Sequence, residues 1–254
     1  MDDRHPAAIG RAADARVLDA PWPGAAAQTC TEPADQPDMY APAAPRALHP
    51  SSRRAARPAV QQFLFDLDGT VTRVEILPEI ARAIGMEREI AELTRETMAG
   101  GLPFESSLRR RVELLKQVPV SEVRAIVRGV KRDPHVVEFL RRNRDRCTIV
   151  TGNLDVWIQD LIADLDVPFC SSAASVDGDR LIGLTSVLDK ATVTANWVGP
   201  ICAIGDGYND LGMLAAAELG IAYGGVHAPA PGLLDVATHA IYDARRLCDF
   251  LSAW

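Results

Sequence analysis

The sequence predicts an α/β fold with a doubly wound parallel sheet as its core and a small helical cap inserted after the first strand. Two observations indicate the core: short apolar runs end in turn residues, and helical patterns lie between these runs. A third observation indicates the cap, because several helical patterns follow the first run without a strand pattern among them. The expected core covers residues 59–73 and 130–254, and the expected cap covers residues 74–129.

The expected strands are short, β-rich runs closed by turn residues, as buried parallel strands usually are. They cover residues 62–65, 147–150, 201–204 and 219–222. Helical patterns occur within the core at residues 134–142, 154–163, 211–217 and 244–251. Strands that alternate with helices predict a sheet wound by crossovers, in which ligands bind at the carboxyl ends of the strands.

The expected cap carries helical patterns at residues 77–84, 88–98, 104–116 and 121–127. Within the core, residues 175–184 predict a β-hairpin centred on Asp177-Gly178. Residues 1–58 are rich in Ala and Pro and poor in large apolar residues, which predicts a disordered or loosely attached tail. The tail is either a low-complexity extension or an arm that docks on a partner.

The composition excludes several classes of protein. The formal net charge of −7 lacks the basic excess that nucleic-acid-binding and membrane-surface proteins usually show. No apolar run approaches the roughly 18 residues that span a bilayer, and the first residues lack the apolar stretch of a secretory signal. The five cysteines form no C-x-x-C pair, which suits a reducing compartment. We therefore expect a cytoplasmic protein without a nucleic-acid or membrane partner, whose oligomeric state the sequence does not indicate.

The strongest chemical signal is the motif Asp66-Leu67-Asp68-Gly69-Thr70, directly after the first apolar run. A turn at Gly69 would let both carboxylates face an open cleft. One carboxylate could then serve as nucleophile and metal ligand, while the other moves protons. Taken alone, the motif is also compatible with an ordinary acidic turn.

A second signal, Gly205-Asp206-Gly207-Tyr208-Asn209-Asp210, directly follows another apolar run. Its two carboxylates and one amide could complete a Mg²⁺ site, because this ion prefers oxygen ligands. The alternative for this motif is a tight turn that caps the following helix.

Two weaker signals accompany these motifs. Thr151 and Gly152 follow the apolar run at residues 147–150, and a hydroxyl with free backbone N–H groups at a helix start can hold a phosphate. Lys190 is one of only three lysines, beside Lys116 and Lys131, in a chain that otherwise uses arginine, which hints at a need for a compact point charge. The alternatives are a plain helix cap and a solvated surface lysine.

Together and in this order, the four signals resemble the haloacid dehalogenase superfamily of phosphohydrolases. Asp66 and Asp68 are similar to its first motif, Thr151 to its second, Lys190 to its third, and the segment from Asp206 to Asp210 to its fourth. The resemblance covers about residues 60–254. The phosphatases and phosphotransferases of the superfamily carry the second aspartate, here Asp68, whereas its dehalogenases lack it.

The expected cap also resembles that of the phosphoserine phosphatases. The resemblance implies that Glu75 engages the substrate amine and that Arg111 engages the substrate carboxylate, which a guanidinium can grip bidentately. It further implies that Met98 and Phe104 line the substrate pocket. Without the resemblance, Arg111 is part of a basic stretch of helix and Glu75 is an incidental surface residue.

The resemblance implies a mechanism with an aspartyl-phosphate intermediate. Asp66 is the nucleophile and Asp68 the acid and base, while Mg²⁺ is held by Asp66, the main-chain carbonyl of Asp68, and Asp206. Thr151 and the Gly152 N–H hold the phosphoryl group, with Lys190 offsetting its charge. Asn209 and Asp210 orient the metal shell and Lys190.

The expected substrate is a small phosphomonoester, most of all O-phosphoserine. A phosphotransferase, or a phosphatase for phosphohomoserine, a sugar phosphate or a secondary-metabolite phosphate, is the alternative within the fold. A non-catalytic binding protein is the alternative from another class. One departure concerns the substrate: the phosphoserine phosphatases usually carry Ser-Gly-Gly-Phe at the second motif, where this chain has Thr151-Gly152-Asn153-Leu154. We expect His135, His227 and His239 to be structural, since no partner lies at ligand spacing from them.

Overall fold

The computed structural model describes residues 60–98 and 100–254, apart from the Met98 side chain. The predicted tail, residues 1–58, therefore lies outside the described residues. The described chain forms a seven-stranded sheet with the strand order β4-β3-β2-β1-β5-β6-β7. Its strands are β1 (Gln62–Phe65), β2 (Cys147–Leu154), β3 (Phe169–Asp177), β4 (Arg180–Ser186), β5 (Ile201–Gly205), β6 (Leu219–Tyr223) and β7 (His239–Ile241).

The predicted α/β class and parallel sheet are confirmed. All neighbouring strands pair in parallel except β3 and β4, which form the expected antiparallel hairpin. Strand β1 lies at the centre, where Phe65 pairs with Ile149 of β2 on one side and with Ile204 of β5 on the other. The residues that follow β1 and β5 therefore leave the sheet side by side at its carboxyl edge.

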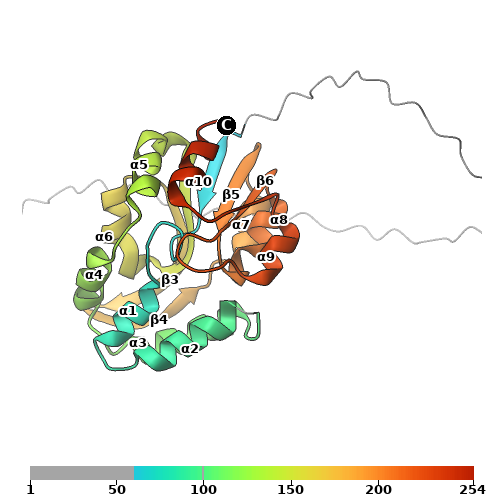
Figure 1. The fold of residues 1–254 in the computed structure, drawn as a ribbon. Coiled ribbons are helices and arrows are strands. Elements are labelled where there is room, and N and C mark those ends of the chain that lie inside the picture. Colours follow the sequence, from blue (N-terminus) through green and yellow to red (C-terminus); the bar gives the residue numbers. More distant parts are fainter. Residues whose placement is uncertain (1–59, 99) are drawn as a thin grey trace, which may run out of the picture. The chain divides into compact units, whose positions relative to one another are not determined.

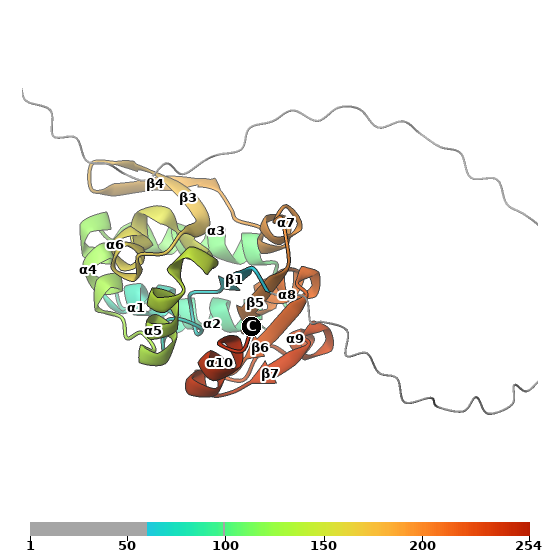
Figure 2. The same ribbon diagram turned by 90° about the horizontal axis from the view of Figure 1, so that it is seen from above.

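Helices cover both faces of the sheet (Figures 1 and 2). Phe63 and Phe65 of β1 point into one apolar core, and Leu64 points into the other, as the alternation of side chains along a strand requires. The first core contains residues of α5 (Pro134–Arg142), α6 (Asp155–Leu165) and α10 (Ala244–Leu251). The second contains residues of α7 (Lys190–Ala195), α8 (Leu211–Ala216) and α9 (Pro231–Val236).

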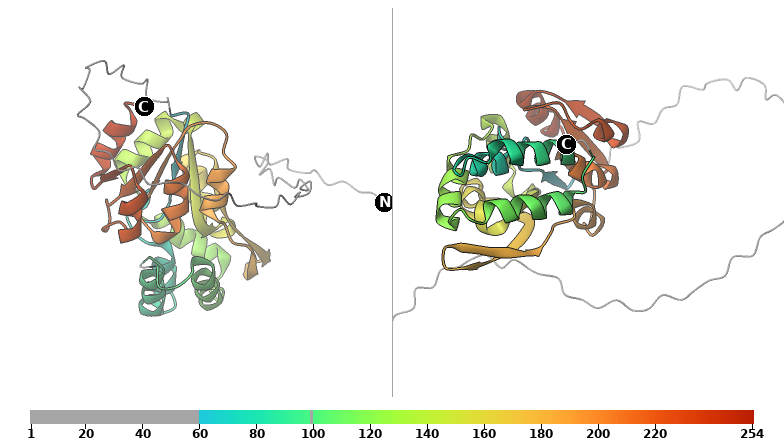
Figure 3. Two further views of the ribbon diagram at one scale, coloured as in Figure 1. Left: turned by 90° about the vertical axis from the view of Figure 1, so that its right-hand side faces the viewer. Right: turned by 90° about the horizontal axis from the view of Figure 1, so that it is seen from below.

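The helices inserted after β1 form a group that we call the helical lobe. They are α1 (Ile76–Arg82), α2 (Glu87–Met98), α3 (Phe104–Leu115) and α4 (Val120–Gly129). Figure 3 shows α2 and α3 lying across the end of the sheet toward which β1 points. The lobe therefore covers the carboxyl edge of the sheet. Within the described residues, none of the helices has the length and apolar character that a membrane span needs.

Three predicted details differ in the structure. Residues 151–153 do not open a helix, since β2 continues to Leu154 and α6 begins at Asp155. Lys190 begins the short helix α7, which was not predicted. Helix α9 and the edge strand β7 were not predicted.

Candidate active site

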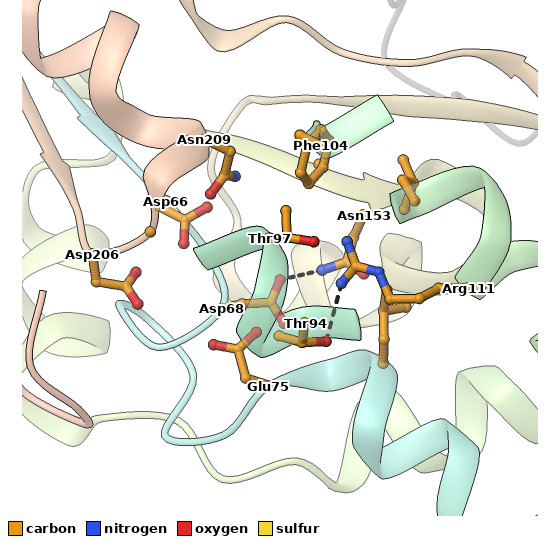
Figure 4. Close-up of a pocket in the computed structure, with 14 residues that line it drawn as sticks. Asp66, Asp68, Glu75, Thr94, Thr97, Phe104, Arg111, Asn153, Asp206 and Asn209 are labelled. Carbon is orange, nitrogen blue, oxygen red and sulfur yellow. Dashed lines mark hydrogen bonds between the residues drawn. The ribbon is translucent and has the colours of Figure 1, made fainter. Parts of the chain in front are cut away.

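Residues from the core and from the helical lobe line one pocket at the carboxyl edge of the sheet (Figure 4). The core contributes Asp66, Asp68, Asp206 and other residues that follow strands. The lobe contributes helix residues from the opposite side, among them Arg111. Of the residues proposed from the sequence, the pocket brings together Asp66, Asp68, Glu75, Phe104, Arg111, Gly152, Asp206 and Asn209.

Four predicted residues do not line this pocket or cannot be placed in it. Thr151, Lys190 and Asp210 are buried and do not belong to the pocket lining. The Met98 side chain lies outside the described residues, so its predicted place in the pocket stays a prediction.

The turn after β1 places the first two carboxylates. The Asp66 N–H donates to the Ile204 carbonyl at 2.9 Å, which continues the pairing of β1 with β5. Gly69 has a φ of 70°, and a Cβ atom there would lie 2.6 Å from Oδ2 of Asp206. Glycine is therefore required, both for the left-handed backbone and for the close approach. Thr70 donates to Oδ1 of Asp206 at 3.1 Å and so ties the two turns together.

Lys190 joins two carboxylates beneath the pocket. Its Nζ forms ion pairs with Asp66 and with Asp210, the latter at 2.5 Å, and its side chain is 2% exposed. Asp189 caps the start of α7 by accepting from the Ala191 N–H at 3.1 Å, which fixes the helix end that carries Lys190. Burial alone would lower the pKa of Lys190, but Asp210 and Asp66 raise it above the ordinary value. The lysine is therefore a fixed positive charge beside Asp66.

Asp210 organises the turn after β5. One carboxylate oxygen accepts from Lys190, and the other accepts from the N–H groups of Asp206 and Gly207, both at 3.0 Å. A Cβ atom on Gly205 would overlap the Asp210 side chain, so glycine is needed at the end of β5. Since both oxygens of Asp210 are occupied, this residue holds its neighbours in place and has little capacity left to bind a ligand.

Burial and mutual repulsion raise the pKa values of the clustered carboxyl groups. Burial raises the pKa of Asp66 well above its ordinary value, and the charges of Asp210, Asp206 and Asp68 act in the same direction, while Lys190 opposes them. Burial and the charge of Glu75 raise the pKa of Asp68 to about 8. Burial also raises the pKa of Asp206 to about 6. A bound divalent cation would favour the ionised form of each group.

The same carboxylates can hold a metal ion. Oxygens of Asp66, Asp206 and Asp210 lie within 4.8 Å of one another. Asp210 is engaged on both oxygens, so Asp66 and Asp206 are the better candidates for ligands. A donor set made of carboxylate oxygens fits Mg²⁺, a hard cation that takes oxygen ligands. The acidic cluster thus fits the predicted kind of metal, while the identity of the ion stays a proposal.

Helix α3 carries the buried cation of the lobe. Arg111 is 5% exposed, and its Nη1 donates to Thr94 of α2 at 3.2 Å. Burial lowers the pKa of Arg111, although the charges of Glu75 and Asp68 oppose this effect. Within the described part of the chain, no carboxylate lies at ion-pair distance from the Arg111 guanidinium, which faces the pocket in Figure 4. The guanidinium can therefore receive an anionic group from a ligand.

Comparison with known proteins identifies the family. A model of haloacid dehalogenase-like hydrolases matches residues 63–215. The chain belongs to the haloacid dehalogenase-like hydrolases.

Within this family, the hydrolase is similar to phosphoserine phosphatases. It is 31% identical to the phosphoserine phosphatase of Methanocaldococcus jannaschii over 181 residues, which cover 63% of this chain and 84% of that protein. It is 32% identical to the phosphoserine phosphatase of Vibrio cholerae over 177 residues, which cover 63% of this chain but only 54% of that protein. The similarity thus covers most of the first of these relatives and about half of the second.

Solved structures agree with this likeness. A phospho-aspartyl intermediate analogue of phosphoserine phosphatase matches with a TM-score of 0.65 and 28% identity, covering 75% of this chain and 98% of the other. A substrate-bound phosphoserine phosphatase complex matches with a TM-score of 0.64 and 27% identity over the same shares of the two chains. The hydrolase therefore shares the core and the inserted helices of these structures.

The sequence did not indicate the contacts of His227, whose predicted structural role stays a prediction. Its Nε2 lies 2.9 Å from Oδ2 of Asp206 and 3.3 Å from Oε1 of Glu75. Hydrogen bonds to these two carboxylates raise the pKa of His227 to about 11, so the imidazole is charged near neutral pH. No local pattern indicates this contact, because the loop between β6 and α9 brings His227 to residues far away in the sequence.

Asn153 and two threonines also belong to the hydrolase pocket. Asn153 was noted in the sequence only as a departure at the second motif, and its Nδ2 donates to Oδ2 of Asp68. Thr94 and Thr97 of α2 are both 5% exposed and were not predicted. The helical pattern of α2 indicates that one face is buried, but it does not show that this face borders a pocket.

Proposed function

We propose that this hydrolase is a Mg²⁺-dependent phosphomonoesterase that works through an aspartyl-phosphate on Asp66 and acts on O-phosphoserine. The observation that carries the proposal is the buried group of Asp66, Lys190 and Asp210 next to Asp68 and Asp206. The likeness to phosphoserine phosphatases, one of them a phospho-aspartyl intermediate analogue, supports both the reaction and the substrate.

In the proposed reaction, Asp66 attacks phosphorus as the bond to the leaving oxygen breaks, and the phosphoryl group moves to the carboxylate. Asp68 gives a proton to the leaving alkoxide. It then takes a proton from the water that attacks the aspartyl-phosphate, which releases phosphate and restores Asp66. Lys190 keeps Asp66 oriented and offsets negative charge near the phosphoryl oxygens.

The remaining residues of the core support these steps. A Mg²⁺ ion held by Asp66, Asp206 and the main-chain carbonyl of Asp68 would offset the charge of the phosphoryl group. Thr151 and the Gly152 N–H hold this group in the proposal. Asn209 and Asp210 orient the groups around it. These roles rest on the motifs, on the burial of Thr151 and Asp210, and on the place of Gly152 and Asn209 in the pocket lining.

The lobe residues account for the proposed substrate. Arg111 offers a buried guanidinium to the substrate carboxylate, and Glu75 offers a carboxylate to its ammonium group. Met98 and Phe104 would contact the carbon skeleton. A phosphatase for phosphohomoserine or a sugar phosphate, and a phosphotransferase, remain the competing functions on the same core, and a non-catalytic binding protein is the competitor of another class.

Phosphate release with Mg²⁺ tests the proposal across O-phosphoserine, O-phosphothreonine, phosphohomoserine and sugar phosphates, with EDTA as a control. We expect the highest kcat/KM for O-phosphoserine and a loss of activity with EDTA that added Mg²⁺ restores. A different preferred ester would reject the substrate, and a phosphoester formed from an added acceptor alcohol would favour phosphotransfer. Absence of turnover with every ester would contradict the enzymatic proposal as a whole.

Replacement of Arg111 by Ala should raise the KM for O-phosphoserine about 100-fold, because a charge-assisted bidentate contact with the carboxylate is lost. Hydrolysis of p-nitrophenyl phosphate, which has no carboxylate, should change far less. Arg110→Ala is the matched control, since Arg110 lies on the same helix and is exposed. An equal loss with both esters in the Arg111 variant would show that this residue supports the fold rather than the substrate.

Replacement of Gly152 by Ala should reduce kcat/KM about tenfold or more. An added Cβ would overlap the ring of Phe104, so this side chain or the start of α3 must shift. A misplacement of about 1 Å can cost as much as 100-fold in rate. Steady-state kinetics compare this variant with Gly183→Ala, whose added Cβ meets nothing within 4 Å. Unchanged kinetics would mean that Phe104 is free to move without consequence.

A further inference from the structure

Asn153 presents a buried hydrogen-bond acceptor that nothing in the described chain satisfies. The residue is 4% exposed at the end of β2, and its Nδ2 donates to Oδ2 of Asp68. Its Oδ1 is buried, and the described residues provide no hydrogen-bond partner for it. A buried carbonyl oxygen without a partner is costly, so this atom is expected to accept a hydrogen bond in the working complex.

The position of Asn153 indicates where this hydrogen bond forms. The residue lines the pocket, and Figure 4 shows its amide directed toward Asp68. Under the proposed function, Asp68 protonates the leaving oxygen of the substrate. The other oxygen of Asp68 accepts from the Ile76 N–H at 2.7 Å, so the carboxylate is held from both sides. Asn153 therefore lies next to the group that meets the first atoms of the leaving alcohol.

The chemistry of this acceptor differs from that of Glu75. An amide oxygen accepts from N–H and O–H groups alike and carries no net charge. Glu75 is a carboxylate that already shares a hydrogen bond with His227, at 3.3 Å. The pocket thus offers two hydrogen-bond acceptors to a donor group of the substrate. The two acceptors should differ in which substrates they favour. Glu75 favours an ammonium over a hydroxyl, whereas Asn153 favours any donor over a methylene.

We propose that Oδ1 of Asn153 determines specificity by accepting a hydrogen bond from an N–H or O–H on the carbon next to the phosphoester carbon. The inference rests on the proposed function and extends it to the substrate class: three-carbon phosphoesters that carry a donor between the phosphate-bearing carbon and the carboxylate. When an analogue without this donor binds, the Asn153 acceptor stays buried without a hydrogen bond. The unpaired acceptor lowers kcat/KM for this analogue.

The test compares three substrates that differ only at this carbon: O-phospho-L-serine with an ammonium, 3-phospho-L-glycerate with a hydroxyl, and 3-phosphonooxypropanoate with hydrogen. In the wild-type hydrolase, we expect both donors to be preferred over hydrogen by about tenfold or more in kcat/KM. Asn153→Leu should reduce this preference to about threefold or less, mainly through KM. Glu75→Gln should instead reduce the preference for ammonium over hydroxyl and keep the preference for hydroxyl over hydrogen.

Two further variants complete the test. Asn196→Leu is the matched control, because Asn196 is exposed at the end of α7 and outside the pocket; its preferences should equal those of the wild type. Asn153→Ala removes the same acceptor without added bulk and replaces Asn153→Leu if that variant does not fold. Asn153 variants that keep the wild-type preference, or a Glu75 variant that loses both preferences, would overturn the inference.

The failure of this inference can be distinguished from failure of the proposed function. A wild-type hydrolase that cleaves p-nitrophenyl phosphate and accepts all three carboxylates equally overturns only the role of Asn153. A wild-type protein that cleaves none of the four esters with Mg²⁺ contradicts the proposed function, and the inference that rests on it falls as well.

Discussion

Replacement of Asp66 by Asn should lower kcat by roughly 10⁴-fold or more while the fold is kept, because the amide cannot accept the phosphoryl group. The fold should persist because Lys190 retains its ion pair with Asp210 when Asp66 loses its charge. Burial already disfavours the charged form of Asp66 and raises its pKa, so a neutral side chain is tolerated there. Steady-state kinetics and thermal unfolding measure the two effects separately.

Asp145→Asn is the matched control for this experiment. The Asp145 side chain is 96% exposed and does not line the pocket, so the same chemical change there should leave kcat and the unfolding temperature unaltered. Activity of Asp66→Asn within about tenfold of the wild type would contradict the nucleophile assignment.

Replacement of Lys190 by Met should damage both activity and stability. The variant leaves Asp66 and Asp210 buried without their shared cation, and breaking a buried ion pair in this way typically costs about 3–5 kcal/mol. The kcat should fall roughly 100-fold or more, because Asp66 loses its orientation and the phosphoryl oxygens lose a positive charge. Lys116→Met, at a half-exposed lysine outside the pocket, is the matched control.

The loss of stability in Lys190→Met should depend on pH. Lys190 lowers the pKa of Asp66, so its removal raises that pKa further above the unfolded value, near 3.8. When the pKa of a carboxyl group is higher in the folded protein than in the unfolded chain, the group contributes most to the free energy of unfolding below the unfolded pKa. This contribution is lost as the pH rises. The difference in free energy of unfolding from the wild type should therefore be larger near pH 8 than near pH 5, as measured by urea unfolding. A difference that is equal at both values, or smaller near pH 8, would contradict this account of the ion pair.

The sequence was sufficient to predict the four strands β1, β2, β5 and β6 and the place of the core carboxylates. The apolar run at residues 62–65 corresponds to β1, and the runs before Thr151 and Asp206 belong to β2 and β5. Parallel strands end at one edge, so Asp66 and Asp206 could be expected to meet there. The resemblance implied that Asp210 orients Lys190, whereas the ion pair between Lys190 and Asp66 was not predicted.

The rest of the pocket depends on contacts between distant segments. His227 reaches Asp206 and Glu75 through a loop, and its residue type and neighbours carry no sign of this contact. Arg111 was proposed from the resemblance, but its burial against Thr94 depends on how α2 and α3 pack. The unpaired oxygen of Asn153 becomes visible only when every neighbour has been placed. Packing of this kind is not encoded in a local period or motif.

The measurement that tests the covalent mechanism most directly is the first turnover of p-nitrophenyl phosphate by Asp68→Asn. Nitrophenolate is a good leaving group that needs no proton, so the aspartyl-phosphate should form at Asp66, while its hydrolysis is slow without the base. We predict a rapid release of about one nitrophenolate per active site, followed by a slow phase, with the phosphoryl group recovered on the peptide that contains Asp66. Linear release from the first turnover, with no phosphoryl group on that peptide, would contradict the covalent mechanism.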